Sequence, residues 1–477
     1  MTVAPPPDPA PPGPSGNWRQ RLPRHIAEFA ALLVVAVAAI AVAVRITPAQ
    51  TVSVAGQVIT VGATAPSLSL SGPGEVDLFG QSLPTTLRFP GPLRPRLALS
   101  QITINSELTN FVRGAGPGGA ERTLGSRLAD GWTHYFAWEI AIAGLGALVL
   151  LGAVAGWRRL PLRTTLVLLA AGLVVTEAIN VSAIVITASR APALLRQVSS
   201  LNQLVGSAPA PQVHVKGRPL PKVQAVVMGD STAAGEGLPP ATGSSPMNLV
   251  CGRSQDSYAQ DLAAVNGWHV LNLACSGATI SQGLLGPQDR NGTIVPPQLA
   301  SAERARNASV IIVNIGANDL NWAAMVTYCS TAPRCDDKAT TAYFQQQLAS
   351  FSKNYLQLLS QLATLPGHPR VIINQYYDPF GPQQDCLSPA GLTPAKLAIL
   401  TSRLTTLNAV LAKGAADFGF LSPQPDFTGH QLCTSQPYVQ GKGDPAPFHP
   451  TALGQLAIAL TDQAALRLTG PPATGLR

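Results

Sequence analysis

A serine, a glycine, an asparagine and a histidine in the second half of the chain lie in short motifs suited to acyl transfer. Ser231 ends the tripeptide Gly-Asp-Ser directly after an apolar run, and His449 lies near the C-terminus. A serine hydroxyl becomes a nucleophile when a histidine takes its proton and later returns it to the leaving group. The backbone N–H groups of Ser231 and Gly277 and the side-chain amide of Asn318 can stabilise an oxyanion, each donor contributing roughly 2.7–4 kcal/mol.

Short apolar runs precede these motifs and predict the strands of a parallel sheet. Helical patterns separate the runs, which indicates βαβ units with helices on both faces of the sheet. Sites on such sheets form beyond the carboxyl ends of the strands, so the motifs are expected to converge there. The predicted strands cover 223–228, 269–274, 309–315 and 370–375, and the predicted helices cover 257–266, 341–365, 394–418 and 452–468.

The four motifs, in this chain order, resemble the blocks of the SGNH (GDSL) hydrolase family. That family's blocks contribute Ser, Gly, Asn and His, and the resemblance spans about 223–470. It implies an α/β fold with a parallel sheet flanked by helices, and esterase or lipase activity. By the same resemblance Ser231 is the nucleophile, His449 the general base, and Ser231, Gly277 and Asn318 form the oxyanion hole.

The acid of the predicted triad departs from the family pattern. The family usually places an Asp three residues before the histidine, where this chain has Ala446. Asp444, five residues before His449, is the candidate acid if a displaced turn brings it to the ring. The alternative is a backbone carbonyl, such as that of Ala446. Either acceptor would set the tautomer of the imidazole.

All six cysteines lie in the second half of the chain. An even count without a Cys-x-x-Cys pair predicts disulfides, and hence an oxidising compartment, over a metal site. The chain also resembles the secreted actinobacterial branch of the family, in which three sequential disulfides are usual. That resemblance implies the pairs Cys251–Cys275, Cys329–Cys335 and Cys386–Cys433.

The first half of the chain has the composition of a membrane region. Charged residues make up 12% of the whole chain, against roughly 25% in soluble domains. Residues 1–222 carry a net charge of +9, whereas residues 223–477 carry −1 and have no basic stripe for nucleic acid. Three apolar runs, at 26–44, 135–157 and 164–189, are each long enough to cross a hydrocarbon core of ~30 Å.

Arginines predict how these runs are oriented. They cluster before the first run and in the turn 157–163 between the second and third. By the positive-inside rule the N-terminus and this turn are cytoplasmic. Short β-branched runs and Gly/Pro turns between the first two helices predict a small β-sandwich. The expected parts are a disordered cytoplasmic tail 1–25, the three helices, an extracellular β-rich domain 46–132, a linker 190–222 and a hydrolase domain 223–477.

These observations predict a multi-pass membrane protein with an extracytoplasmic serine esterase domain. It would hydrolyse carboxylic esters of lipids or O-acylated glycans through an acyl-enzyme. One alternative is an O-acyltransferase that acts on envelope glycans with the same serine and histidine, and a second is a non-catalytic envelope scaffold or sensor. The sequence has no His-Glu-x-x-His motif, His/Cys cluster or phosphate-binding loop. We therefore expect no cofactor, no metal and no nucleic-acid partner.

Overall fold

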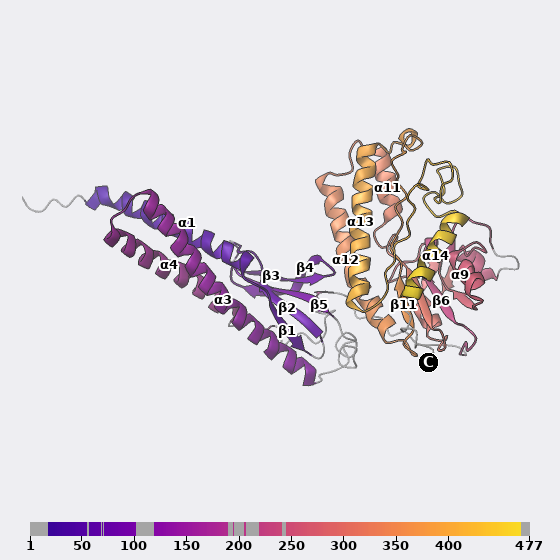
Figure 1. Ribbon diagram of the computed structural model, residues 1–477, viewed down its shortest axis with the longest axis horizontal. Coiled ribbons are helices and arrows are strands. Elements are labelled where there is room, and N and C mark those ends of the chain that lie inside the picture. The colour runs from indigo at the N-terminus through magenta and orange to yellow at the C-terminus, as the bar shows by residue number, and fades with distance from the viewer. Residues whose placement is uncertain are drawn as a thin grey trace, which may run out of the picture.

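The computed structural model has a bundle of long helices, a small β-sheet beside it and a larger α/β unit (Figure 1). It describes residues 18–54, 57–67, 71–101, 119–188, 219–240 and 245–468, and the positions 69, 194, 205 and 206. The predicted tail over 1–25 and the predicted linker over 190–222 lie mostly outside the described residues.

Three long helices pack against one another at one end of the molecule (Figure 1). They are α1 (Trp18–Ile46), α3 (Gly119–Trp157) and α4 (Leu162–Ala188). Each contains a stretch that is long and apolar enough to cross a membrane, in keeping with the three predicted runs. These stretches are Glu28–Ile46, Asp130–Trp157 and Leu162–Thr187.

Small side chains lie between these helices. Ala39, Ala43 and Ala143 are buried, whereas many valines and leucines of the same helices face outward. Small residues allow helix backbones to approach closely, which is how helices associate in lipid. One polar contact also joins two of the helices, because Asn180 Nδ2 donates a 2.8 Å hydrogen bond to Glu139 Oε2.

The β-rich segment is a single sheet of five strands, and the predicted sandwich is wrong for the described residues. The strand order is β1-β2-β5-β3-β4, and a parallel contact joins β3 to β5. Helix α3 supplies the second layer, since Trp132 Nε1 donates to the Gly62 carbonyl at 3.2 Å. The strands are β1 (Gln50–Val54), β2 (Gln57–Ala63), β3 (Ser71–Leu78), β4 (Gln81–Pro90) and β5 (Pro95–Gln101).

The α/β unit is built on a four-stranded sheet in the order β11-β10-β6-β7, with every neighbouring pair parallel. This confirms the predicted fold class. The strands coincide with the four apolar runs of the sequence. They are β6 (Ala225–Gly229), β7 (Val270–Asn272), β10 (Val310–Asn314) and β11 (Arg370–Ile373).

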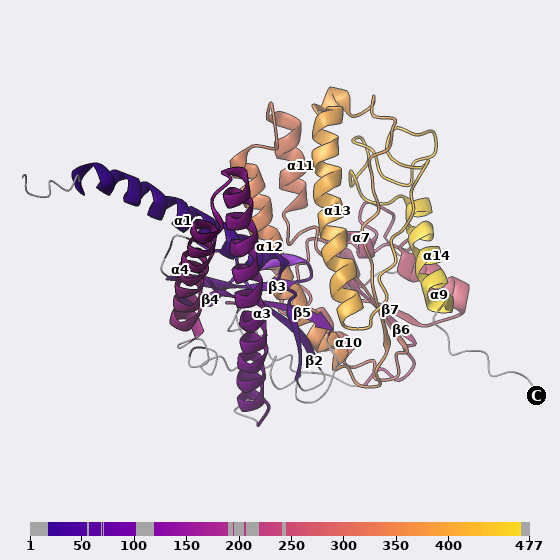
Figure 2. The ribbon, with the colours of Figure 1, turned by 60° about the vertical axis from the view of Figure 1, so that its left-hand side comes forward.

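Helices cover both faces of this sheet, with α12 (Lys338–Ala363) and α13 (Pro394–Asp417) on one face and α9 (Tyr258–Asn266) and α14 (Ala452–Leu468) on the other (Figure 2). Successive side chains of a strand point to opposite faces. Accordingly, Val226 packs with the first helix pair and Val227 with the second. A sheet buried on both faces needs continuous apolar strands, which explains why the runs do not alternate with polar residues.

Shorter elements complete the unit at the carboxyl edge of the sheet and around it. They are α7 (Ser231–Ala234), α8 (Pro246–Val250), β8 (Gln288–Arg290), β9 (Thr293–Val295), α10 (Gln298–Ala302), α11 (Trp322–Thr331) and the 3-10 helix Ser388–Ala390.

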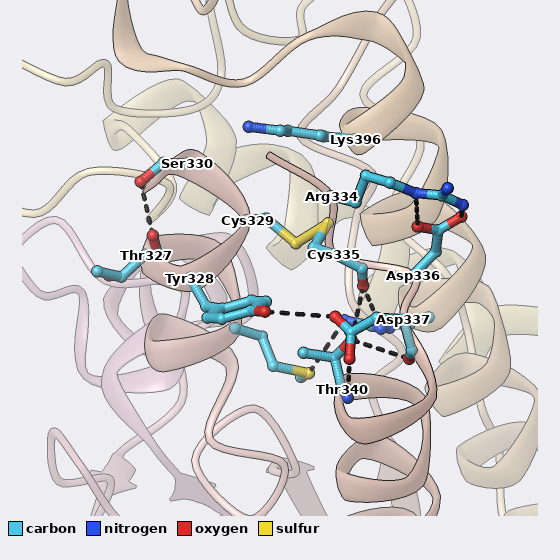
Figure 3. Close-up of a disulfide and its surroundings, with 12 residues drawn as sticks. Thr327, Tyr328, Cys329, Ser330, Arg334, Cys335, Asp336, Asp337, Thr340 and Lys396 are labelled. Atoms are coloured by element: carbon cyan, nitrogen blue, oxygen red, sulfur yellow. Dashed lines mark hydrogen bonds and ion pairs between the residues drawn. A yellow bond between two sulfur atoms is a disulfide. The ribbon is translucent and has the colours of Figure 1, made fainter. Parts of the chain in front are cut away.

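Three disulfides join the loops of the α/β unit: Cys251–Cys275, Cys329–Cys335 and Cys386–Cys433. These are the pairs that the family resemblance implies. Figure 3 shows the second, which ties the end of α11 to the turn before α12.

Asp337 organises that turn. Its Oδ1 accepts the Ala339 and Thr340 N–H groups at 2.9 and 3.1 Å, and so caps α12 (Figure 3). The disulfide and the cap together hold α11 at the end opposite its first residue, Trp322.

The small sheet contacts the α/β unit through the turn between β3 and β4. The Phe79 ring meets the Tyr355 ring of α12 edge to face, with 5.5 Å between centroids. Both side chains are buried, and they belong to one continuous apolar cluster. The small sheet and the α/β unit are therefore in contact through aromatic packing.

A buried carboxyl group lies between α14 and the end of β11. Asp462 has no exposed surface, and its Oδ2 accepts a 3.1 Å hydrogen bond from Asn374 Nδ2. Burial raises the pKa of Asp462 to about 8, although the Asn374 hydrogen bond acts in the opposite direction. Burial disfavours the charged form of a carboxyl group, so the protonated acid is the form that suits this place.

We predict that the protein loses stability as pH rises. Because the folded-state pKa of Asp462 is raised from 3.8 to about 8, the native state binds the extra proton between these values. Stability contributed by this group is therefore full below about pH 4 and is lost as pH rises toward 8, by up to about 1.4 kcal/mol per pH unit. Asp462→Asn keeps a neutral side chain and should flatten the dependence, measured as melting temperature of the full chain in detergent.

The exposed Asp385 supplies the matched control. Asp385→Asn should retain the wild-type slope of melting temperature against pH. Parallel curves for wild type and Asp462→Asn would contradict the assignment of the slope to Asp462.

Candidate active site

Ser231 begins helix α7 directly beyond β6. The turn before it requires a glycine, because Gly229 has φ 148° and a Cβ there would collide with the backbone oxygen of Asn314. Asp230 then caps α7, its Oδ1 accepting the Thr232 N–H at 3.0 Å. Strand end, glycine turn and cap together present Ser231 at the carboxyl edge of the sheet.

His449 is hydrogen-bonded to Ser231. Its Nε2 lies 2.8 Å from Ser231 Oγ, and its Nδ1 lies 3.2 Å from the Pro447 carbonyl oxygen. A carbonyl only accepts, so the Pro447 contact assigns the imidazole proton to Nδ1. Nε2 is then the acceptor for the serine hydroxyl, which is the state that a general base needs.

The structure corrects the prediction for Asp444. Its Oδ2 accepts the Gly441 N–H at 2.7 Å, and its own N–H donates to the Gly441 carbonyl at 3.1 Å. The side chain thus closes a local turn, as Asp often does, and does not orient His449. The Ala446 carbonyl, the alternative acceptor, instead takes the backbone N–H of His449 at 3.2 Å.

Phe448 accounts for the position of the Pro447 carbonyl. Phe448 has φ 69°, an uncommon conformation for a non-glycine residue. Two hydrogen bonds hold it there: its N–H donates to the Gln440 carbonyl at 2.9 Å, and its carbonyl accepts the Tyr377 hydroxyl at 2.7 Å. The resulting bend places a main-chain acceptor beside the histidine ring, where a triad has a carboxylate.

Gly277 and Asn318 line the same cavity as Ser231 and His449. Gly277 has φ 76°, and Asn318 Nδ2 donates a 2.9 Å hydrogen bond to the Ala278 carbonyl. That bond orients the amide and uses one of its two N–H groups, which leaves the other available to a ligand. The loops after β6, β7 and β10 thus bring Ser231, Gly277 and Asn318 together, and the segment before α14 adds His449.

The cavity has a volume of about 470 Å³ and walls of two kinds. Helices α11 and α13 form an apolar wall, and Glu236 and Arg290 are charged residues that line the remainder. Glu236 Oε2 lies 3.8 Å from His449 Nε2. The apolar wall consists of Trp322, Ala323, Val326, Leu404 and Leu407.

Asp230 also connects two loops behind the serine. Its Oδ2 accepts a 2.6 Å hydrogen bond from the Tyr376 hydroxyl, which in turn accepts the Ala317 N–H at 3.0 Å. Burial raises the pKa of Asp230 to about 6, and the Tyr376 hydrogen bond opposes that rise. The network fixes the loop of Ser231 against the loop of Asn318.

Comparison with known families decides the identity of the α/β unit. The GDSL-like Lipase/Acylhydrolase family matches residues 227–457, from β6 into α14. The match is confined to that segment, which is just under half of the chain. The resemblance to SGNH (GDSL) hydrolases is thereby confirmed, and so is the prediction of a serine ester hydrolase.

Individual relatives of the GDSL hydrolase segment come from Streptomyces. The chain is 29% identical over 252 residues to a lipase of Streptomyces rimosus, which covers 49% of this chain and 84% of that protein. It is 27% identical over 240 residues to lipase 1 of Streptomyces coelicolor, with 48% and 81% covered. The crystal structure of the extracellular Streptomyces rimosus lipase aligns with a TM-score of 0.39 at 24% identity, over 51% of this chain and 99% of that one.

Three features of the GDSL hydrolase site were missed from the sequence. They are the Pro447 carbonyl, the Glu236 carboxylate beside His449 and the Arg290 guanidinium near Gly277. Every residue has a backbone carbonyl, so the sequence does not show which carbonyl has a functional role. Glu236 lies within the serine motif and could have been identified by its position, whereas Arg290 is part of no motif.

We predict that Asp444 contributes little to catalysis. Asp444→Asn keeps an acceptor oxygen for the Gly441 N–H and should retain kcat/KM within about threefold, because no contact with His449 is lost. His449→Ala removes the base and should lower kcat by about 10³-fold or more. Ester hydrolysis by the purified full-length variants measures both. A loss for Asp444→Asn comparable to that for His449→Ala would restore Asp444 as the acid.

Proposed function

We propose that this protein is a membrane-anchored serine esterase whose hydrolase segment acts outside the cytoplasm on carboxylic esters. The observation that carries the proposal is the 2.8 Å contact between His449 Nε2 and Ser231 Oγ beside an apolar cavity. An apolar wall suits the acyl chain of a lipid or of an O-acylated glycan.

The reaction follows from the placement of these groups. Ser231 Oγ attacks the ester carbonyl while His449 Nε2 takes its proton. Backbone N–H groups of Ser231 and Gly277, with the free N–H of Asn318, receive the oxyanion. His449 then protonates the departing alcohol, and a water molecule activated by the same nitrogen hydrolyses the acyl-enzyme.

The Pro447 carbonyl keeps the imidazole proton on Nδ1 through both steps. This carbonyl presents a dipole to His449 Nδ1, whereas the carboxylate of a Ser-His-Asp triad presents a full negative charge. Glu236, at 3.8 Å from Nε2, adds a negative charge that favours the imidazolium formed after proton transfer.

We predict that hydrolysis depends on Ser231. The full chain in detergent should cleave p-nitrophenyl esters, and Ser231→Ala should lower kcat by about 10³-fold or more, because no other nucleophile replaces the hydroxyl. Ser402→Ala, which alters an exposed serine of α13, is the matched control. Comparing kcat/KM for p-nitrophenyl esters of short, medium and long acyl chains would show how much of the apolar wall contacts the acyl chain.

Two results would contradict the esterase. Turnover that survives Ser231→Ala would remove the proposed mechanism. Release of p-nitrophenol only when a sugar is added, with the acyl group recovered on that sugar, would instead establish an acyltransferase.

The location of the hydrolase segment rests on charge and on cysteine chemistry. Arg158 and Arg159 are exposed in the turn between α3 and α4, and Arg163 is exposed at the start of α4, which by the positive-inside rule favours a cytoplasmic turn. Helix α3 separates this turn from the small sheet, and helix α4 separates it from the hydrolase segment. If each helix crosses the membrane once, the small sheet and the hydrolase segment both lie outside. Three disulfides in that segment favour the same side, since they persist in oxidising compartments.

We predict opposite accessibility for the turn and the hydrolase segment. An epitope tag placed after Arg477 should bind antibody on intact cells, because that end follows the third crossing. A tag inserted after Arg159 should bind only after the membrane is permeabilised. The reverse pattern, or equal access of both tags in intact cells, would contradict the proposed topology.

A further inference from the structure

Arg290 lies at the edge of the catalytic cavity, at the end of the hairpin β8–β9. The sequence builds this hairpin locally, since Asn291 and Gly292 have φ 52° and 85°. Asn-Gly is the preferred pair for a two-residue hairpin turn in which both residues need positive φ. Asp289 Oδ1 also accepts the Gly292 N–H at 2.7 Å. Arg290 is therefore presented by a rigid turn.

The hairpin is fixed against the proposed oxyanion hole. Gln288 is buried, and its Nε2 donates a 2.9 Å hydrogen bond to the carbonyl of Ser276, the neighbour of Gly277. A Cβ added at Gly277 would lie 3.2 Å from Arg290 Nη1. The guanidinium thus lies beside Gly277, one of the proposed oxyanion donors, and both residues line the cavity.

The charge of Arg290 has no partner within the described part of the chain. No described carboxylate forms an ion pair with it, and its Nε is shielded from solvent without a hydrogen bond. Glu236, the acid that lines the cavity, lies beside His449. A partly buried guanidinium with free donors gains free energy when an anion supplies acceptors.

We propose that Arg290 binds an anionic oxygen group, a carboxylate or a phosphate, that the ester substrate carries close to its carbonyl. This inference rests on the proposed esterase and names its substrate class: anionic esters are preferred over neutral ones. The planar guanidinium can hold such a group through two parallel hydrogen bonds, which gives orientation as well as affinity. The apolar wall formed by α11 and α13 is then free to bind the hydrocarbon part of the substrate.

Two sources of the anion are distinguished by two substrate pairs. In the first, the charge is on the acyl side: the p-nitrophenyl monoester of adipic acid is compared with p-nitrophenyl hexanoate. In the second, it is on the alcohol side: fatty-acid release from phosphatidylglycerol is compared with release from diacylglycerol in neutral detergent micelles. The full chain is used throughout, and the ratio of kcat/KM for anionic over neutral substrate is the readout.

Arg290→Gln should lower this ratio by tenfold or more in one of the two pairs, mainly through KM. Arg290→Lys keeps the charge without the planar fork and should give an intermediate ratio. Arg467→Gln removes the same charge from an exposed site at the end of α14 and should leave the ratio as in wild type. The pair in which the ratio falls identifies which side of the ester carries the anion.

Two results would overturn the proposal. Equal loss of activity on anionic and neutral esters would mean that Arg290 acts on the oxyanion and not on a substrate anion. If Arg290→Gln left the ratio of kcat/KM unchanged in both substrate pairs, Arg290 would not recognise the anionic group of either substrate.

A binding measurement separates this proposal from the proposed esterase. Trp322 lines the cavity, so its fluorescence reports occupancy in the Ser231→Ala background, where no turnover is needed. Decyl phosphate and decanoate should bind at least tenfold more tightly than decanol, and Arg290→Gln should remove that preference. Anion binding without hydrolysis by wild type would overturn the esterase alone, and hydrolysis without anion preference would overturn the role of Arg290 alone.

Discussion

The hydrogen bond between Ser231 and His449 joins residues that are 218 positions apart in the chain. A parallel sheet is what makes such a contact reproducible, because its strands all end at one edge. The two central strands, β6 and β10, are buried on both faces, so they cannot slide without exposing apolar side chains. The positions of the loops that carry the serine, the glycine and the asparagine follow from that constraint.

The histidine is oriented by the backbone, with no carboxylate in contact with Nδ1 among the described residues. A carbonyl dipole stabilises an imidazolium less than a full negative charge does, but it adds no charged group to the back of the site. The acids near Ser231 have other tasks. Asp230 caps α7 and accepts from Tyr376, and Asp319 accepts the Ile280 N–H at 3.1 Å, which ties the loops after β7 and β10. Burial raises the pKa of Asp319 to about 7.

The regions outside the sheet restrain the walls of the cavity. Helix α11 contributes Trp322 to the apolar wall and is tied at its other end by the Cys329–Cys335 disulfide. The contact of Phe79 with Tyr355 links the small sheet to α12. That contact belongs to an apolar cluster that the small sheet shares with the helices covering one face of the parallel sheet.

The sequence by itself determined the features whose signals are local: apolar runs for strands, three long apolar helices, an even number of cysteines, and the motifs of Ser231, Gly277, Asn318 and His449. Each depends on residue type and spacing. Only the tertiary structure decided that the Pro447 carbonyl and not Asp444 faces the histidine, because every residue has a backbone carbonyl and the direction of this one is set by the bend at Phe448. It also decided that the β-rich segment is one sheet against α3, and that Arg290 lies near Gly277, since such contacts join segments distant in sequence.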